Sequence, residues 1–124
     1  MEFFAHIPTH GMDDEALSEH LSIAALPEYC DSIDKVLSQA GESEGEIYCL
    51  WGQFRVARQR LKKGVRFALL NCPHALAWTV TCHQGGDRLT VHCTIDKTQE
   101  DEDFVESINL FVADWAAGLE RAFA

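Results

Sequence analysis

Residues 65–96 decide the fold, and they read VRFALLNCPHALAWTVTCHQGGDRLTVHCTID. Apolar residues alternate with polar or small residues along three runs of this stretch, and β-branched and aromatic types are frequent in them. This alternation is typical of half-buried β-strands. The apolar positions are Val65, Phe67, Leu69, Leu76, Trp78, Val80, Cys82, Leu89, Val91, Cys93 and Ile95.

The turns between these runs predict how the strands pair. Gly85-Gly86 tolerates the positive φ of a tight hairpin turn, and Cys72-Pro73 is the candidate turn of the preceding hairpin. Both turns place apolar residues opposite apolar residues, whereas a slip of one residue would oppose apolar to polar. The expected pairs are Leu69–Leu76, Phe67–Trp78 and Val65–Val80 in the first hairpin, and Cys82–Leu89, Val80–Val91 and Trp78–Cys93 in the second.

The N-terminal third predicts an arm followed by two helices. Residues 1–11 (MEFFAHIPTHG) are expected to form an ordered arm or a short edge strand. Asp13 or Asp14 can cap a first helix that stops before Pro27. Pro27 suits the first position of a second helix, which Gly41 would end. Its apolar residues recur at offsets of three and four, namely Tyr29, Ile33, Val36, Leu37 and Ala40.

Two segments complete the expected architecture. Between residues 46 and 61, Gly52 either turns a hairpin that pairs Cys49 with Val56 or bends one long strand, so the sheet has four or five strands. Residues 100–123 carry a wide apolar stripe and predict a long helix. We therefore expect a single two-layer α+β domain, with an antiparallel meander over residues 46–96. The helical hairpin of residues 12–40 and the C-terminal helix would pack on one face of it.

Charge and composition limit the possible partners. The 124 residues carry a net charge of −10, and the chain is 47% hydrophobic. The central residues 47–99 sum to +6, whereas the flanking segments sum to −16. A nucleic-acid-binding domain of this size is normally basic, so nucleic acid is not expected. No apolar run reaches the roughly 20 residues of a membrane helix. Five cysteines without framework spacing, and no basic leader at the N-terminus, indicate a cytoplasmic protein with reduced thiols.

A basic band between residues 55 and 66 holds six of the ten Lys and Arg residues. It can bind an anionic ligand or an acidic partner. It can also be a solvated strand edge that prevents aggregation, or be neutralised by the acidic helices. The candidate binding residues of this band are Arg55, Arg58, Arg60 and Arg66.

The polar face of the predicted sheet is the second candidate site. Thr79, Thr81, His83 and His92 share this face, which has few Lys and Glu residues and can pack against a second copy or remain in solvent. A zinc site is not expected, because strand alternation directs Cys82 and Cys93 to the opposite face from the two histidines.

Cys72 is the third candidate, as a possible reactive thiol or haem ligand in the sequence Cys72-Pro73-His74. Reactivity would require a lowered thiol pKa, and a proline-containing turn explains the same residues.

No hydrolase, nucleotide-binding or metalloprotease motif is present, and no cofactor is expected. The leading hypothesis is a non-enzymatic adaptor, a homodimer that recognises a protein partner. The alternative is a domain that binds a small anionic or apolar ligand between sheet and helices. That pocket would be lined by Trp51, Phe67, Trp78 and Trp115, with Arg58 or Arg66 holding any anion.

Overall fold

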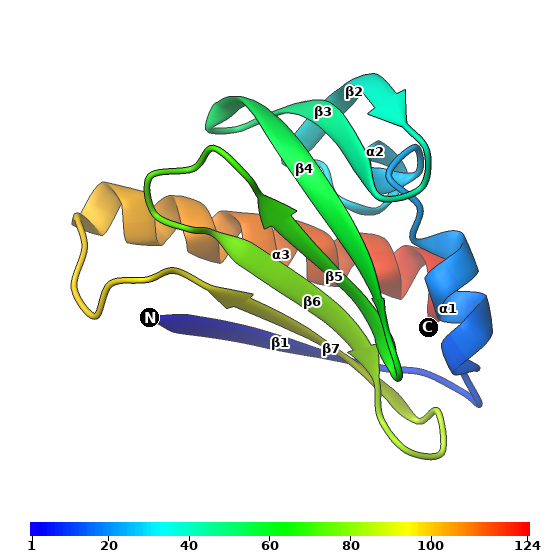
Figure 1. Cartoon of the computed structure of the whole chain (residues 1–124). Helices are drawn as coiled ribbons and strands as arrows, with labels where there is room; N and C mark the ends of the chain where they lie inside the picture. Colours follow the sequence, from blue (N-terminus) through cyan, green and yellow to red (C-terminus); the bar gives the residue numbers. More distant parts are fainter.

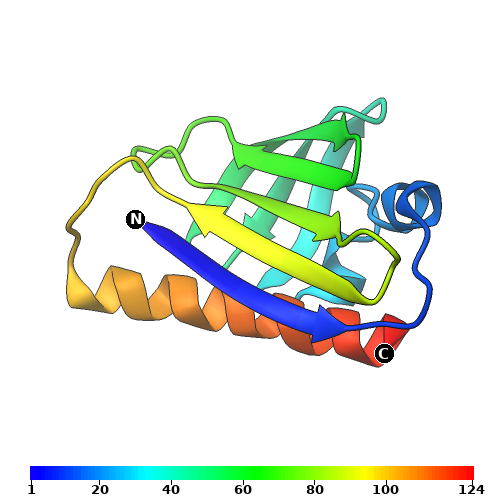
Figure 2. The same cartoon turned by 90° about the horizontal axis from the view of Figure 1, so that it is seen from below.

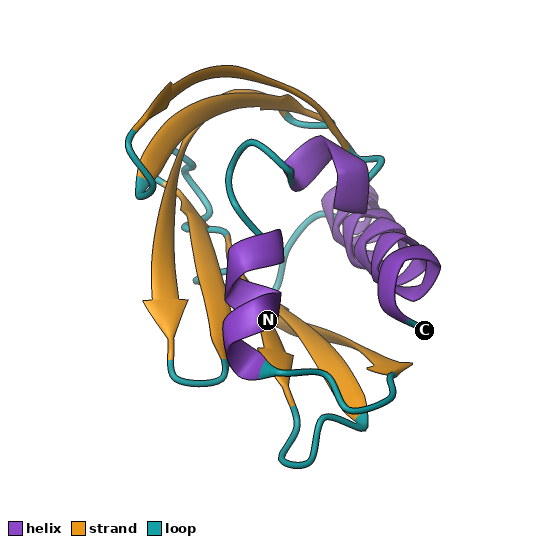
Figure 3. Ribbon diagram, turned by 90° about the vertical axis from the view of Figure 1, so that its right-hand side faces the viewer, coloured by secondary structure: helices purple, strands orange, loops and turns teal.

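The computed structural model describes all 124 residues as one curved antiparallel sheet that wraps around three helices (Figures 1 and 3). The seven strands lie in the order β1-β7-β6-β5-β4-β3-β2. The long helix α3 lies on the concave side of the sheet, together with α1 and α2. The elements are β1 (Glu2–Pro8), α1 (Asp14–His20), α2 (Leu26–Tyr29), β2 (Ile33–Ala40), β3 (Glu44–Cys49), β4 (Gly52–Leu61), β5 (Gly64–Leu69), β6 (Ala77–Cys82), β7 (Arg88–Thr94) and α3 (Glu102–Phe123).

The two hairpins of residues 65–96 have the predicted registers. Phe67 pairs with Trp78 and Val65 with Val80 between β5 and β6. The β6–β7 pairs are Cys82–Leu89, Val80–Val91 and Trp78–Cys93, and Gly85 and Gly86 both have positive φ. Period-two alternation therefore specified this part of the sheet, because only one register buries a complete apolar face.

The N-terminal arm is an edge strand that pairs with the last strand of the sheet. Residues 2–8 run antiparallel to β7, with Glu2 opposite Thr94 and Pro8 opposite Arg88. Figure 2 shows β1 lying alongside α3, so this edge is close to the helix. The segment had been expected to be an arm or a short edge strand. The paired residues are 80 to 92 positions apart along the chain, which local sequence signals do not reveal.

The predicted helical hairpin is wrong, because the first helix ends at His20 instead of just before Pro27 and most of the second helix does not form. The first helix forms as α1, and the Asp13 side chain accepts a hydrogen bond from the Ala16 backbone N–H. The second helix, however, is only the single turn α2, and residues 33–40 form strand β2.

Two bulges in β2 explain why the apolar residues of this strand have the spacing expected of a helix. Register shifts occur between Ile33 and Lys35 and between Val36 and Ser38. Residues 33, 36 and 39 consequently pair with residues 49, 47 and 45 of β3. Each bulge adds one residue, so the inward positions of β2 recur every three residues instead of every two. That spacing is close to the helical period on which the prediction depended.

The segment before β5 forms another hairpin, and the sheet has seven strands instead of four or five. Leu50 and Trp51 make its turn, with Cys49 opposite Gly52. The predicted pairing of Cys49 with Val56 is therefore wrong, since Val56 lies opposite Gly45.

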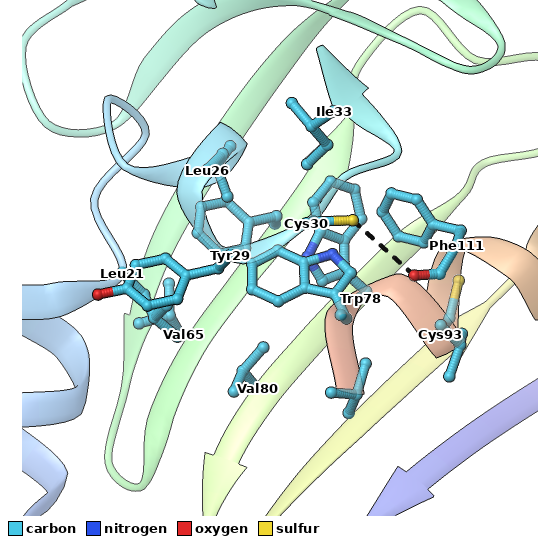
Figure 4. Close-up of a cluster of buried hydrophobic side chains, with 14 of the residues drawn as sticks. Leu21, Leu26, Tyr29, Cys30, Ile33, Val65, Trp78, Val80, Cys93 and Phe111 are labelled. Carbon is cyan, nitrogen blue, oxygen red and sulfur yellow. Dashed lines mark hydrogen bonds between the residues drawn. The ribbon is translucent and has the colours of Figure 1, made fainter. Parts of the chain in front are cut away.

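The middle of the concave side is tightly filled by aromatic side chains. Phe67, Trp78, Phe111 and Trp115 are at most 1% exposed. The ring centroid of Trp78 lies 5.3 Å from that of Phe67 and 4.9 Å from that of Phe111. The ring centroids of Phe67 and Trp115 are 6.3 Å apart. Figure 4 shows how α2 and the following residues close this cluster, where the Cys30 thiol donates a hydrogen bond to the Phe111 carbonyl.

Gly118 allows α3 to approach the end of α2. A Cβ atom at this position would lie 1.8 Å from the Tyr29 carbonyl oxygen. A glycine is therefore required there for close backbone contact. None of the helices combines the length and the apolarity needed to span a membrane.

Candidate functional site

A pocket opens at the end of the sheet where α3 begins. Its volume is about 250 Å³, and six of its eight lining residues are hydrophobic. They come from the β3–β4 turn, β4, the end of β5, the β5–β6 loop and the first turn of α3. The lining residues are Trp51, Phe54, Leu69, Cys72, Pro73, His74, Leu76 and Phe104.

Trp51 is held in place by the first turns of α3. Its indole N–H donates a hydrogen bond to the Ser107 hydroxyl over 2.8 Å, and that hydroxyl donates to the Phe104 carbonyl over 2.6 Å. The indole also packs against Phe111, with ring centroids 5.0 Å apart. One wall of the pocket is therefore fixed before any ligand binds.

The β5–β6 loop forms the opposite wall. The Leu69 backbone N–H donates to the Leu76 carbonyl, and the Ala75 N–H donates to the Cys72 carbonyl. Ala75 has a φ of 50°, in the left-handed region. In this loop the His74 ring stacks on the Phe104 ring, with ring centroids 4.1 Å apart. The Asp96 N–H donates to the His74 carbonyl, which ties the loop to the segment leading into α3.

His74 and Glu100 place a polar pair beside this apolar pocket. The Nδ1 atom of His74 lies 3.1 Å from the Oε2 atom of Glu100. The two atoms are at ion-pair distance, but both are buried and neither makes a hydrogen bond of regular geometry. Each atom is therefore the other's partner, and the Lys97 ammonium lies 4.0 Å from the same Glu100 oxygen.

The pocket is not where the sequence had placed it. Of the four aromatic residues expected to line it, only Trp51 does so. Phe67, Trp78 and Trp115 pack against one another and fill the middle of the concave side.

The five cysteines are free, and they differ in burial. Cys72 is partly exposed and lines the pocket, whereas the other four are buried. Burial raises the pKa of Cys30 and of Cys93 to about 12, and it also raises the pKa values of Cys49 and Cys82. These four thiols are neutral at physiological pH and therefore weakly nucleophilic.

The basic band does not form one surface. Arg58 and Arg60 line a hollow beside α1, whereas Arg66 lines a shallow depression on the opposite face of the sheet. Arg55 pairs with Glu44, with 3.7 Å between Nη2 and Oε1. Strand alternation separates these side chains, since adjacent residues point to opposite faces.

The convex face carries the predicted threonines and one of the two histidines. Thr79 pairs with His92 and Thr81 with Thr90. His83 lies after β6 in the turn, with its Nδ1 atom 3.2 Å from Asp87. His92 stacks on Phe4 with centroids 4.3 Å apart, and its Nε2 atom lies 2.9 Å from Glu2. No three His, Cys, Asp or Glu side chains are grouped so that they could hold a metal ion.

Sequence reasoning missed most of the pocket because its walls come from five separate segments. Phe104 lies within residues 100–123, whose apolar stripe was expected to face the sheet, and Leu69 and Leu76 had been assigned to the strands. The association of His74 with Glu100 had no sequence signal, since 26 positions separate them. Trp51 and the Cys72-Pro73-His74 turn had been singled out, and both lie at the pocket.

No protein-family model and no curated protein sequence matches this chain. Several solved structures share its fold. XoxI from Bacillus cereus is 13% identical, with a TM-score of 0.67 over 99% of this chain and 94% of that one. An uncharacterised protein from Bacillus thuringiensis is 12% identical, with a TM-score of 0.68 over 99% and 97%. An AHSA1-like protein from Aeromonas hydrophila is 8% identical, with a TM-score of 0.55 over 98% and 94%.

These similarities define the fold. The chain has an α+β fold in which a seven-stranded antiparallel sheet grips a long C-terminal helix, as in an AHSA1-like protein. At 8–13% identity the similarity concerns architecture alone. The candidate site therefore has to be argued from this chain's own residues.

Proposed function

We propose that this protein binds a small, flat, predominantly apolar molecule in the pocket at the start of α3. The observation that carries the proposal is the wall of Trp51, Phe54 and Phe104 around an open hollow of about 250 Å³. Binding sites are typically concave, mostly apolar and equipped with few polar groups. This pocket has that composition, with His74 as its polar residue and Glu100 next to it.

The size and chemistry of the pocket favour one or two fused rings carrying one hydrogen-bonding group. Typical ligand pockets have volumes of about 300 to 1,000 Å³, so this one suits a compact ligand. Aromatic walls favour a flat ligand, because offset-stacked and edge-to-face ring contacts add to the gain from burial. A hydroxyl or amine on the ligand would face His74, the polar residue of the pocket lining.

The three tryptophans provide a direct test. We expect 2-naphthol to shift the indole N–H resonance of Trp51 in a saturable way in ¹H–¹⁵N NMR spectra. The resonances of Trp78 and Trp115, which lie in the filled middle of the molecule, should not move. Bound 2-naphthol should also slow the reaction of Cys72 with a thiol reagent, because this thiol lines the same pocket.

Matched variants of α3 sharpen this test. Phe104→Ala removes a pocket wall and should weaken 2-naphthol binding about tenfold or more, corresponding to about 1.4 kcal/mol. Leu110→Ala is the control, because Leu110 is on the same helix and is 54% exposed. The proposal fails if the Trp51 resonance does not respond, or if Phe104→Ala and Leu110→Ala bind equally well.

A second function, that of a homodimeric adaptor, is favoured by the convex face of the sheet. Phe4 is 56% exposed there and stacks on His92. The neighbouring strands contribute small side chains, among them Ala77 and Thr79, which allow a second sheet to approach. Aromatic residues are enriched in protein interfaces relative to the rest of the surface. The occupant that we propose for this face is a second copy of the chain.

Light scattering coupled to gel filtration tests the adaptor function. The wild-type protein should elute as a dimer, and Phe4→Asp should elute as a monomer with an unchanged circular dichroism spectrum. Leu37→Asp, which introduces the same charge at another exposed apolar residue, should remain dimeric. A wild-type monomer at high concentration would contradict this function without affecting the pocket proposal.

A further inference from the structure

A second hollow, of about 200 Å³, lies between α1, β2 and β4 and has no hydrophobic lining residue. Two arginines and two glutamates line it, together with two serines and a glutamine. It shares no lining residue with the pocket at the start of α3. The four charged residues are Glu19, Glu42, Arg58 and Arg60.

Arg58 is the fixed part of this hollow. It is only 8% exposed, and its guanidinium donates hydrogen bonds from Nε to the Leu21 carbonyl and from Nη2 to the Ser18 carbonyl. Ser18 is in the last turn of α1 and Leu21 is its C-cap, where backbone carbonyls lack intrahelical partners. No protein group accepts a hydrogen bond from Nη1, and the Arg58 side chain lines the hollow. The side chain is thus held rigidly while one nitrogen stays available.

The charges around the hollow are balanced but unpaired. Burial, and then repulsion from Arg60, lowers the pKa of Arg58, while Glu42 acts in the opposite direction. The seven ion pairs of the molecule include none of the four charged residues of the hollow. Two cationic and two anionic groups therefore face a polar space without neutralising one another by direct contact.

We propose that this hollow binds a small zwitterion of the α-amino-acid type. The carboxylate of the ligand would pair with Arg58 and Arg60, and its ammonium group with Glu19 or Glu42. Hydrogen bonds between ionised groups are about twice as strong as neutral ones, and a fixed guanidinium loses little entropy when it forms them. The absence of hydrophobic lining residues favours a ligand with a short side chain.

The same charge balance disfavours ions of a single sign. A simple anion would meet Glu19 and Glu42 and the overall charge of −10. A simple cation would meet Arg58, which cannot move away because two hydrogen bonds hold it. Only a molecule that carries both charges finds a group of opposite charge for each of them. The charged side chains that line the hollow therefore favour a zwitterion as the ligand.

The side-chain Nε–H resonance of Arg58 is the natural probe, because this group is buried and hydrogen-bonded. We expect glycine to shift it saturably in ¹H–¹⁵N spectra of the full chain. Acetate and methylammonium, which each carry one of the two charges of glycine, should bind at least about tenfold more weakly, the equivalent of about 1.4 kcal/mol. An Arg58 resonance that does not respond to glycine, or that responds equally to acetate, overturns the proposal.

Variants at the exposed residues of the hollow avoid the risk of unfolding that a change at Arg58 would carry. Arg60→Gln and Glu42→Gln should each weaken glycine binding about fivefold to tenfold, with the Arg58 signal as readout. Arg88→Gln and Glu120→Gln remove equivalent charges elsewhere and should leave glycine binding unchanged. Glycine affinity that does not differ between Glu42→Gln and Glu120→Gln would show that the ammonium group has no partner, and would also overturn the proposal. The pocket at the start of α3 is unaffected by either result.

Discussion

The middle and the end of the concave side are built from the same residue types and have opposite properties. In the middle, Phe67, Trp78 and Trp115 are almost completely buried and in contact with one another. At the end, Trp51, Phe54 and Phe104 are only partly buried and surround an open pocket. Aromatic residues therefore do not identify a pocket on their own. The difference arises because regular strands and α3 pack face to face in the middle, whereas turns and a loop close the end.

Substituting one tryptophan in each region tests this contrast most strongly. Trp115→Ala should reduce the free energy of unfolding by about 4 kcal/mol, since it leaves a large cavity in a filled core. Trp51→Ala should cost roughly half as much, because this side chain is partly exposed and loses only part of its burial. Urea denaturation of both variants measures the difference. Equal losses would mean that the end of the sheet is as tightly packed as its middle.

Gly118→Ala tests how closely the helices approach on the packed side. In an open helix this change would stabilise by about 1 kcal/mol. Here the new Cβ would meet the Tyr29 carbonyl at 1.8 Å, so we expect a loss of about 2 kcal/mol instead. The exposed position 113 provides the control, since Ala113→Gly should show the ordinary propensity cost. A Gly118→Ala protein more stable than wild type in thermal unfolding would disprove the close contact.

The buried thiols make the packed middle sensitive to alkaline pH. Burial raises the pKa of Cys93 to about 12 from its ordinary value of 9.0. The unfolded chain therefore loses this proton first, and the free energy of unfolding decreases as the pH rises through the interval from about 9 to 12. At pH 10 the loss from one such thiol is about 1.4 kcal/mol relative to pH 8.

Urea denaturation of a Cys93→Ala variant at pH 8 and pH 10 isolates this contribution. The difference between the two pH values should be smaller than in the wild type by about 1.4 kcal/mol. Val80→Ala, another core substitution without a titrating group, should retain the full wild-type difference. If the difference were the same in all three proteins, the Cys93 thiol would have to ionise as easily when folded as when unfolded.

Local patterns were reliable only where strands were regular. The alternation from Val65 to Ile95 predicted both hairpin registers, because each turn left one arrangement that buries the apolar face. The same reasoning failed for β2, where two bulges shift the inward positions to a spacing of three. A bulge depends on the partner strand, so no rule applied to residues 33–40 alone would have distinguished this strand from a helix.

The candidate site was less predictable than the fold. The turn at Cys72 was recognised, and the guanidinium of Arg58 does line a polar hollow. The central aromatic residues, however, were expected to surround a ligand and instead fill the core. The contact between His74 and Glu100 joins a loop to the residues before α3, and neither residue carries a local signal for it.

The sequence by itself determined the antiparallel hairpins, the long C-terminal helix and the segregation of charge, because each depends on periodicity or composition within one segment. The tertiary structure alone decided that the first strand pairs with the last and that residues 33–40 join the sheet. It also decided which aromatic residues fill the interior and which leave a pocket open. Those outcomes depend on how curved surfaces from distant segments fit together, and that fit is a property of the packed molecule as a whole.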